Sequence, residues 1–300
     1  MPERYRISIV IPTIEEDAAF GVIRRIKGLF NGDAEIIVVD KSSKAYKNKL
    51  AATGAKVIDQ EDSGYENAVM AGFRAAHGKV FASIDPDGTY DPNDMLKGLK
   101  LIEEGKAEVV FGNRFAGKDD DAMTKYISFG NRSLTSIYNR LYKAKIHDVL
   151  TGIFMFTSKA FESIRDVEPY RAGTAFFAIE LSKQGYKIKE IPIRYMPRTS
   201  GKSKLSRSKF AYGLGVAGHM IRFFRDYSPL LLFGGIGAVL ILAGIAVGVM
   251  VLANYIATGT LNEVGRALIA FMLVTIGFLS IIAGLIIDLL LQISKKIERL

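Results

Sequence analysis

The sequence predicts an α/β domain, in which helices flank a mostly parallel sheet, followed by two membrane-spanning helices. Three observations support this prediction. Short apolar runs alternate with segments of helical spacing in the first part of the chain, polar residues directly follow several of these runs, and the last quarter holds two long stretches without a charged residue. Continuous apolar strands that alternate with helices are typical of a parallel sheet buried on both faces. Long uncharged stretches are typical of transmembrane helices.

The apolar runs and the helical spacing place the elements of the α/β domain in order. Strands are expected over residues 7–11, 35–39, 55–58, 79–84 and 107–111, and helices over residues 17–30, 65–77 and 92–104. Most strand runs are rich in the β-branched residues Ile and Val, which favour strands. The first helix repeats apolar side chains at Phe20, Ile23 and Ile26, a spacing that puts them on one face.

Polar residues directly follow three of the expected strands. They lie at residues 12–16, 40–43 and 85–87. Because ligands of such sheets bind beyond the carboxyl ends of the strands, the three segments are expected to form one site. The chain has neither GxGxxG after a strand nor the GxxxxGKS/T pattern, so a dinucleotide-binding fold and a P-loop are not supported.

The segment Asp85-Pro86-Asp87-Gly88 has two interpretations. Asp, Pro and Gly are typical turn formers, so the stretch by itself is typical of a tight turn. It is not an EF-hand loop, because Tyr90 stands where that loop requires glycine. Its position after a buried strand favours a site for a divalent ion such as Mg²⁺, which prefers carboxylate and phosphate oxygens.

The composition limits the chemistry and the partners. The chain has no cysteine and three scattered histidines, so neither a disulfide nor a zinc site is expected. The net charge of +9 indicates an anionic partner, such as a phosphate-bearing substrate or a membrane surface. Much of the basic excess lies next to the uncharged stretches, where anionic lipid explains it better than nucleic acid does.

The two uncharged stretches are long enough to span a membrane. The first span is expected over residues 229–252 and the second over residues 267–287. The 24 residues of the first make a helix of about 36 Å, against about 30 Å for the hydrocarbon core of a bilayer. Basic residues flank the hairpin on both outer sides, and the positive-inside rule therefore puts the N-terminal domain and both termini in the cytoplasm.

The expected organisation has four parts. They are a cytoplasmic domain over residues 1–205, a linker over 206–227, a transmembrane hairpin over 228–291 and a basic tail over 292–300. The start of the chain does not match a signal peptide, so export of the domain is not expected. Residues 210–224 mix apolar and basic side chains and are interpreted as an amphipathic helix at the membrane interface, or else as a helix packed on the domain.

Glycines in the first span have two interpretations. Gly244 and Gly248 form a small-xxx-small step, which permits close helix packing and would support a homo-oligomer through the transmembrane helices. Glycine is also simply common in membrane spans.

Eight motifs of the domain occur in the order of one known family. They are IVIPTIEE (9–16), EIIVVDKSS (35–43), SGYENAVMAGFRAAHGKV (63–80), SIDPDGTYDP (83–92), VVFGNRF (109–115), HDVLTGIFMF (147–156), AIELSKQGYKIKEIPIRY (178–195) and RTSGKSKL (198–205). With them the chain resembles the family 2 glycosyltransferases of the GT-A fold. Within that family it is most similar to the dolichyl- and polyprenyl-phosphate hexose synthases, the dolichol-phosphate mannose synthase group. The two spans resemble the membrane hairpin of many members.

The resemblance implies a site for a divalent cation, Mg²⁺ or Mn²⁺. Asp85 and Asp87 match the DxD pair that holds the ion on the diphosphate of a nucleotide sugar. Thr89 stands where the family often has glutamine, and it is a poorer metal ligand.

The resemblance also implies a binding site for the nucleotide sugar. The matching residues are Pro12, Thr13, Ile14, Glu16, Asp40, Lys41, Gly64, Asp85, Arg198, Lys202 and Lys204. Asp40 matches the strand end that meets the base and the ribose, but the acidic pair usual at that place is broken by Lys41. A lysine can only donate hydrogen bonds, for instance to a base carbonyl. Both GDP-mannose and UDP-glucose are compatible with the family.

The remaining matches concern the acceptor and the transfer step. The resemblance assigns Arg114 and Arg132 to the acceptor phosphate, and Ser136, four residues after Arg132 on one helix face, is expected to help hold that phosphate. The resemblance also assigns Asp87, Arg114, Arg132, Asp148 and Glu180 to catalysis. A lipid phosphate is already an anion and needs positive charge rather than a strong base, and arginine presents a fork suited to phosphate oxygens.

Three of these residues keep a second interpretation. Arg132 could be a solvated helix residue, although Ser136 lies four positions on and would share its face. Asp148 could be a turn or cap residue rather than part of the sugar pocket. Glu180 either orients the sugar or caps a polar network.

The expected function is that of a membrane-anchored inverting glycosyltransferase. It would move a hexose, mannose or glucose, from a nucleotide sugar to dolichyl or polyprenyl phosphate. One alternative is a transferase with another lipid or a polysaccharide as acceptor, although the chain has no Trp for a QxxRW-type motif. Another is a catalytically silent membrane adaptor that binds nucleotide sugars.

Overall fold

The computed structural model describes residues 5–117, 123, 125–170, 172–197, 229–260 and 263–297. The chain divides into two compact units, residues 1–205 and 206–300, and each is described by itself. Arg198, Lys202, Lys204 and the expected interfacial helix of residues 210–224 lie outside the described residues.

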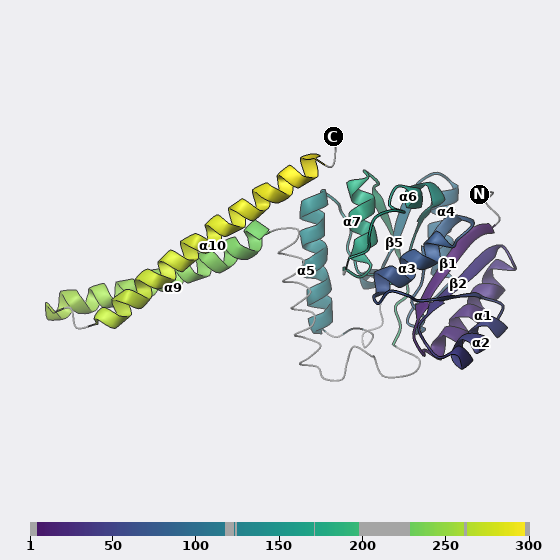
Figure 1. Cartoon of the computed structure of the whole chain (residues 1–300), viewed down its shortest axis with the longest axis horizontal. Coiled ribbons are helices and arrows are strands. Elements are labelled where there is room, and N and C mark those ends of the chain that lie inside the picture. The colour runs from purple at the N-terminus through teal and green to yellow at the C-terminus, as the bar shows by residue number, and fades with distance from the viewer. Residues whose placement is uncertain are drawn as a thin grey trace. The chain divides into compact units, whose positions relative to one another are not determined.

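The first unit is built on a seven-stranded sheet in the order β3-β2-β1-β4-β6-β5-β7 (Figure 1). The strands are β1 (Tyr5–Thr13), β2 (Ala34–Asp40), β3 (Lys56–Asp59), β4 (Gly78–Ser83), β5 (Val109–Asn113), β6 (Phe154–Thr157) and β7 (Ile188–Pro192). The prediction of a mostly parallel sheet is confirmed. Strand β6 alone runs antiparallel to both of its neighbours, β4 and β5, which its apolar sequence did not reveal.

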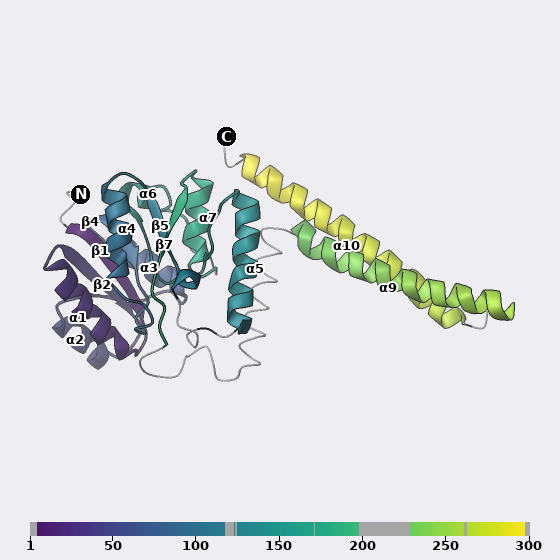
Figure 2. The ribbon, with the colours of Figure 1, turned by 180° about the vertical axis from the view of Figure 1, so that it is seen from behind.

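Helices cover both faces of this sheet (Figures 1 and 2). They are α1 (Ala18–Phe30), α2 (Lys44–Ala52), α3 (Tyr65–Arg74), α4 (Asp94–Glu103), α5 (Lys125–Tyr142), α6 (Ser158–Glu162) and α7 (Ala175–Lys183), with a 3₁₀ turn, η1 (Arg114–Ala116), after β5. Helices α1 and α4 pack on one face, and α3, α6 and α7 pack on the other. Helix α2 was not predicted, because Leu50 is the one side chain that it buries and the apolar period is therefore weak.

Alternation along the strands explains the two cores. Ile7, Ile9 and Ile11 of β1 point to the core shared with α1 and α4, whereas Val10 points to α3. On the α3 side six phenylalanines form a cluster of ring contacts: Phe73, Phe81, Phe154, Phe156, Phe161 and Phe177. Both faces of the central strands are therefore buried, as their continuous apolar sequences predicted.

A buried polar cluster joins β1, β2 and the residue before β4. The Ser8 hydroxyl donates to Glu35 (2.5 Å), and the same carboxylate accepts from the backbone N–H of His77 (2.8 Å). Ser8 is fully buried and its hydroxyl points to the acid rather than to the imidazole. The cluster therefore holds strands together and is not a nucleophile site.

The second unit is a hairpin of two long helices, α9 (Pro229–Thr258) and α10 (Val264–Ile297), which lie side by side in both views (Figures 1 and 2). Both helices are long and apolar enough to cross a membrane. Glycines set their close approach: a Cβ on Gly237 would lie 2.5 Å from the carbonyl oxygen of Gly277, and a Cβ on Gly244 would lie 2.8 Å from that of Ala270. Gly244, one half of the expected self-association step, thus packs within the hairpin, because the second span of the same chain already lies against it.

We expect Gly72→Ala to lower the melting temperature of the protein. A Cβ at Gly72 would overlap the side chain of Val10, where α3 packs on β1, and such overpacking costs about 1–3 kcal/mol. Thermal unfolding of the full chain in detergent, followed by circular dichroism, measures the change. Gly21→Ala in α1 is the matched control, since nothing lies within 4 Å of its Cβ position. It should leave the melting temperature unchanged or raise it, by the roughly 0.5–1 kcal/mol that alanine gains over glycine in a helix. Equal effects of the two substitutions would contradict this account of the α3–β1 contact.

Candidate functional site

The carboxyl ends of β1, β2 and β4 lie next to one another at one edge of the sheet. Thr13, the last residue of β1, pairs with Asp40, the last residue of β2, and Val10 of β1 pairs with Ser83, the last residue of β4. Parallel pairing therefore brings together the three polar segments that were expected to form a site.

The loops after β1 and β2 are joined through Ser42. Its hydroxyl accepts a hydrogen bond from the backbone N–H of Glu15 (2.8 Å) and donates one to Asp40 (2.8 Å). Ile14 is exposed and Glu16 is buried, while Pro12 and Thr13 are buried as the end of β1. The predicted nucleotide-contacting segment thus presents Ile14 to solvent, on a loop fixed to the next strand end.

The loop after β3 is hydrogen-bonded to the loop after β2 at the same edge of the sheet. Lys41 donates from Nζ to the hydroxyl of Ser63 (2.8 Å), and the backbone N–H of Gln60 donates to the carbonyl of Asp40 (3.0 Å). Gly64 follows and caps the start of α3 with φ of 129°, a conformation that favours glycine. This backbone conformation explains why the motif has glycine at position 64, independently of any ligand contact.

The acid pair after β4 is held by its own turn. The Thr89 hydroxyl donates to Asp87 Oδ1 (2.7 Å), and the backbone N–H of Thr89 donates to the same atom (3.1 Å). Thr89 is buried, so its hydroxyl supports the Asp87 carboxylate rather than facing solvent. Thr89 thus positions Asp87, and its role as a third metal ligand stays a prediction.

The Asp85 carboxylate lies against Gly152 and Tyr90. Any side chain at Gly152 would overlap it, and the N–H of Gly152 donates to the Tyr90 hydroxyl (2.7 Å). Burial raises the pKa of Tyr90 well above its usual value, so the hydroxyl remains neutral. Burial, and next the negative charge of Asp85, raise the pKa of the Tyr65 hydroxyl of α3.

Sequence reasoning missed these supporting residues. Tyr90, Gly152 and Tyr65 all lie inside the quoted motifs, but an aromatic ring or a glycine in a motif carries no signal of the loop that it will contact. Contacts between β4, α3 and the loop before β6 form only in the folded domain.

Arg114 and Asp148 form a buried, two-point ion pair. Nε donates to Oδ2 (2.6 Å), Nη2 donates to Oδ1 (2.7 Å), and the backbone N–H of Arg114 also donates to Oδ2 (3.2 Å). The side chains are 8% and 0% exposed. The guanidinium also lies over the ring of Tyr195, 5.5 Å from its centre. Its charge is therefore compensated within the protein.

Glu190 of β7 fixes the loop that carries Asp148. Its Oε1 accepts from the backbone N–H groups of His147 (2.7 Å) and Asp148 (2.9 Å), and its Oε2 contacts His147 Nδ1 (2.8 Å). The Asp148 side chain itself bonds to Arg114 rather than to the backbone of its own loop, so a turn or cap role alone does not describe it.

Arg132 and Ser136 lie on an exposed face of α5. The Arg132 guanidinium stands 4.9 Å from the centre of the Phe115 ring, in the turn that also holds Arg114. The neighbouring Phe129 is 72% exposed. Arg132, unlike Arg114, has no carboxylate partner among the described residues, so it can offer its charge to a phosphate.

Glu180 lies inside α7 and is buried. Its Oε1 accepts from the Tyr170 hydroxyl (2.7 Å) and from Lys183 Nζ (2.8 Å). Neither partner belongs to the predicted site, which favours the network interpretation over a role at the sugar.

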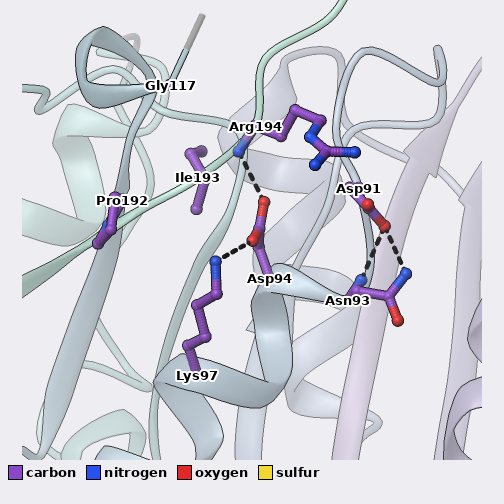
Figure 3. Close-up of a pocket in the computed structure, with 8 residues that line it drawn as sticks. All are labelled: Asp91, Asn93, Asp94, Lys97, Gly117, Pro192, Ile193 and Arg194. Atoms are coloured by element: carbon purple, nitrogen blue, oxygen red, sulfur yellow. Dashed lines mark hydrogen bonds and ion pairs between the residues drawn. The ribbon is translucent and has the colours of Figure 1, made fainter.

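A cavity of about 410 Å³ lies where the end of β7 meets the start of α4 (Figure 3). Both of its carboxylates are hydrogen-bonded: Asp94 accepts from Lys97 (2.6 Å) and from the backbone N–H of Arg194 (2.6 Å), and Asp91 accepts from Asn93 (Figure 3). None of its lining residues is among the predicted site residues.

The donor set fits a divalent ion that is shared with a phosphate ligand. The part of the chain that the structure describes contains no group of three His, Cys, Asp or Glu residues that could hold a metal ion alone. Mg²⁺ is commonly bound by one or two carboxylates together with substrate phosphates and water. Asp85 and Asp87 offer those two carboxylates at the edge where a nucleotide would lie.

We expect Asp148→Asn to destabilise the domain strongly, because it leaves the Arg114 charge buried without a partner. Breaking a buried pair costs about 3–5 kcal/mol, whereas apolar replacement of both members is often neutral. The double variant Arg114→Met/Asp148→Leu should thus regain much of the lost melting temperature but remain inactive. Glu162→Gln, in the exposed pair with Arg165, is the control and should cost at most about 1 kcal/mol. If Asp148→Asn and Glu162→Gln had the same melting temperature, this would contradict the expected stabilisation of the domain by the Arg114–Asp148 pair.

Comparisons with known proteins show which family the chain belongs to. The family model for glycosyl transferase family 2 matches residues 8–165. The glycosyltransferase AglJ of Haloferax volcanii is 27% identical and covers 100% of both chains. The dolichyl-phosphate hexose transferase of the same organism is 31% identical over 72% of this chain and 92% of its own. The dolichol-phosphate mannosyltransferase of Pyrococcus furiosus is 28% identical over 67% of this chain and 59% of its own.

One solved structure supports the fold. The mannosyl-3-phosphoglycerate synthase of Rubrobacter xylanophilus superimposes with a TM-score of 0.53 at 17% identity, over 74% of each chain. This likeness concerns the architecture, a GT-A-like sheet flanked by helices. The family model, in contrast, spans more than half of the sequence, and the chain belongs to glycosyl transferase family 2.

Proposed function

We propose that the protein transfers a hexose from a nucleotide sugar to dolichyl or polyprenyl phosphate at a membrane. The observation that carries this proposal is the 31% identity to the dolichyl-phosphate hexose transferase of Haloferax volcanii over 72% of this chain. Two helices that could cross a membrane support it, because a polyprenyl acceptor resides in the bilayer. The basic flanks of the hairpin support a cytoplasmic position for the catalytic domain and for both termini.

The donor would bind along the edge formed by β1, β2 and β4. In this proposal Pro12, Thr13, Ile14, Glu16, Asp40, Lys41 and Gly64 surround the nucleotide, together with Arg198, Lys202 and Lys204 beyond the described residues. Asp85 and Asp87 would hold Mg²⁺ or Mn²⁺, which supplies positive charge to the diphosphate when bound. Thr89 would hold the Asp87 carboxylate through its hydroxyl. Tyr90 would hold Gly152, against which the Asp85 carboxylate lies.

The acceptor supplies its own nucleophile. A phosphate oxygen of the lipid attacks the anomeric carbon of the hexose, the bond from that carbon to the nucleotide diphosphate breaks, and the configuration inverts. The lipid phosphate is already ionised, so the step needs no proton acceptor. What limits it is the approach of two anions, which favours cationic groups that are not already neutralised.

The two arginines would then have different roles. Arg132, on the exposed face of α5 with Ser136, offers to the acceptor phosphate a guanidinium that has no carboxylate partner among the described residues. Arg114 is neutralised by Asp148, so it would not add net charge. It would instead hold the loop that carries Asp148 and the ring of Tyr195 in place near the sugar.

A transfer assay tests the function. Full-length protein in detergent, with Mg²⁺ or Mn²⁺, is given labelled GDP-mannose or UDP-glucose and polyprenyl phosphate, and the lipid fraction is analysed. We expect a labelled polyprenyl-phosphate hexose and none with unphosphorylated polyprenol, because the alcohol lacks the ionised oxygen. Transfer to diacylglycerol alone, or to no lipid with any nucleotide sugar, would overturn the proposal.

The acid pair can be tested within the same assay. Asp87→Ala should abolish transfer and metal-dependent nucleotide binding, because it removes one of the two carboxylates. Thr89→Ala should lower the rate by about tenfold at most, the cost of one lost hydrogen bond to Asp87. Asp59→Asn, an exposed carboxylate at the end of β3, is the control and should retain full activity. Equal losses for Asp87→Ala and Thr89→Ala would mean that Thr89 is itself a ligand.

A further inference from the structure

Helix α5 presents its exposed side chains on one narrow stripe. Among the side chains of α5 that the structure describes, the exposed ones follow one another at intervals of three and four residues: Lys125, Phe129, Arg132, Ser136 and Arg140. At about 3.6 residues per turn, these positions lie within about 80° of one another around the helix. Lys143, directly after the helix, is exposed as well. We call these residues the α5 stripe.

The opposite side of α5 packs on α7. Tyr138 is buried there, and its hydroxyl is hydrogen-bonded to the hydroxyl of Ser182 (2.5 Å). The two helices lie next to each other in both views (Figures 1 and 2). The α5 stripe therefore points away from α7, and the packing between the two helices does not explain which side chains it carries.

The α5 stripe is basic, and no acid lies near it in the sequence. Its cations are Lys125, Arg132, Arg140 and Lys143, and the chain has neither Asp nor Glu between residues 122 and 147. Within the part of the chain that the structure describes, none of these cations forms an ion pair with a carboxylate. The stripe therefore favours an anionic partner.

Phe129 adds an aromatic ring to this basic surface. It is 72% exposed, more than any other large apolar side chain described between residues 5 and 197, where Ile14 (47%) and Leu96 (37%) come next. Such a ring gains contact where it can leave water, as it does at the boundary between lipid headgroups and acyl chains. An anionic lipid surface suits both the ring and the cations, and the two helices that could cross a membrane, α9 and α10, keep the domain near one.

We propose that the α5 stripe docks the first unit on the anionic surface of the bilayer. Phe129 lies among the headgroups, and Lys125, Arg140 and Lys143 pair with lipid phosphates along the helix. Arg132 keeps its proposed place at the acceptor phosphate, which lies at the same level because it is the headgroup of a lipid. Docking thus lets an acceptor reach Arg132 without leaving the bilayer. It does not depend on sugar transfer, so it can be measured without a substrate.

A single fluorescent reporter tests the docking. The chain has no tryptophan, so Phe129→Trp places the one indole of the protein on the stripe. Full-length protein is studied in nanodiscs of phosphatidylcholine with and without phosphatidylglycerol. In anionic discs the emission should shift to shorter wavelength, and lipids brominated near the headgroup end of their acyl chains should quench it. Both effects should be weaker in phosphatidylcholine alone and should fall with added salt, which screens surface charge.

Charge removal tests the cations separately. In the Phe129→Trp protein, Lys125→Gln, Arg140→Gln and Lys143→Gln together should reduce the quenching in anionic discs. Each basic residue near an anionic surface favours the docked over the undocked state by about fivefold, so the three substitutions should remove most of the docking. Arg132 and the acceptor phosphate are left untouched by this design.

Two control proteins match these variants. Leu96→Trp places the reporter on α4, outside the stripe, where it should stay in water and unquenched. Lys44→Gln, Lys49→Gln and Lys159→Gln together remove the same charge from exposed lysines elsewhere in the domain, and in the Phe129→Trp protein they should leave the quenching unchanged.

Four results would overturn the inference. They are a reporter at position 129 that stays in water in anionic discs, one that is shielded but not quenched by brominated lipid, as a protein partner would make it, equal losses in the two triple variants, and a response to a single-stranded oligonucleotide without a response to lipid. Quenching by lipid in a protein that transfers no sugar would support the docking and remove only the proposed function. Transfer by a protein without quenching would do the reverse.

Discussion

The parallel pairing of β1 with both β2 and β4 is the constraint on which the site depends. It places Thr13 beside Asp40 and Val10 beside Ser83, so that three chain segments far apart in sequence leave the sheet at one edge. The pairing is stable because the strands are apolar on both faces: the isoleucines of β1 meet α1, and Val10 meets Gly72 of α3. A slip of one residue would turn both sets of side chains to the wrong helix layer.

Hydrogen-bonded carboxylates then shape the loops at this edge. Asp40, Asp87 and Asp148 each accept a backbone N–H as well as a side-chain donor, from Ser42, Thr89 and Arg114 in turn. Glu66 of α3 acts in the same way on the N–H groups of Ala172 and Gly173, ahead of α7. Because an unpaired buried charge is costly, such bonds hold irregular loops in one conformation. An acid in a family motif can thus be structural, and it contacts the ligand only where its oxygens are accessible.

The hairpin follows a different physical rule. In an apolar solvent, burial of apolar surface gives little gain, so helices associate where small residues let the backbones come close. Gly237 against Gly277 and Gly244 against Ala270 provide such contacts within the chain. The outward side chains of α9 and α10 remain large and apolar, which is compatible with a lipid environment. The same composition that marks the spans in the sequence therefore also explains how they pair.

Elements whose signal is local could be predicted from the sequence. The continuous apolar strands, the amphipathic α1, α3 and α4, the two long apolar helices and the motif positions of Asp85 and Asp87 were all predictable, because each depends on neighbouring residues. Helix α2, with one buried side chain, and the antiparallel direction of β6 were not, since packing and the path of the chain decide them. Three outcomes depend on the tertiary structure. Arg114 is neutralised by Asp148, and Thr89 supports Asp87. Asp40 is buried and bonded to Ser42, whereas Lys41 is exposed. Each of these outcomes depends on burial and on which hydrogen-bond partner lies near a given atom in the folded domain. Neither is determined by spacing along the chain.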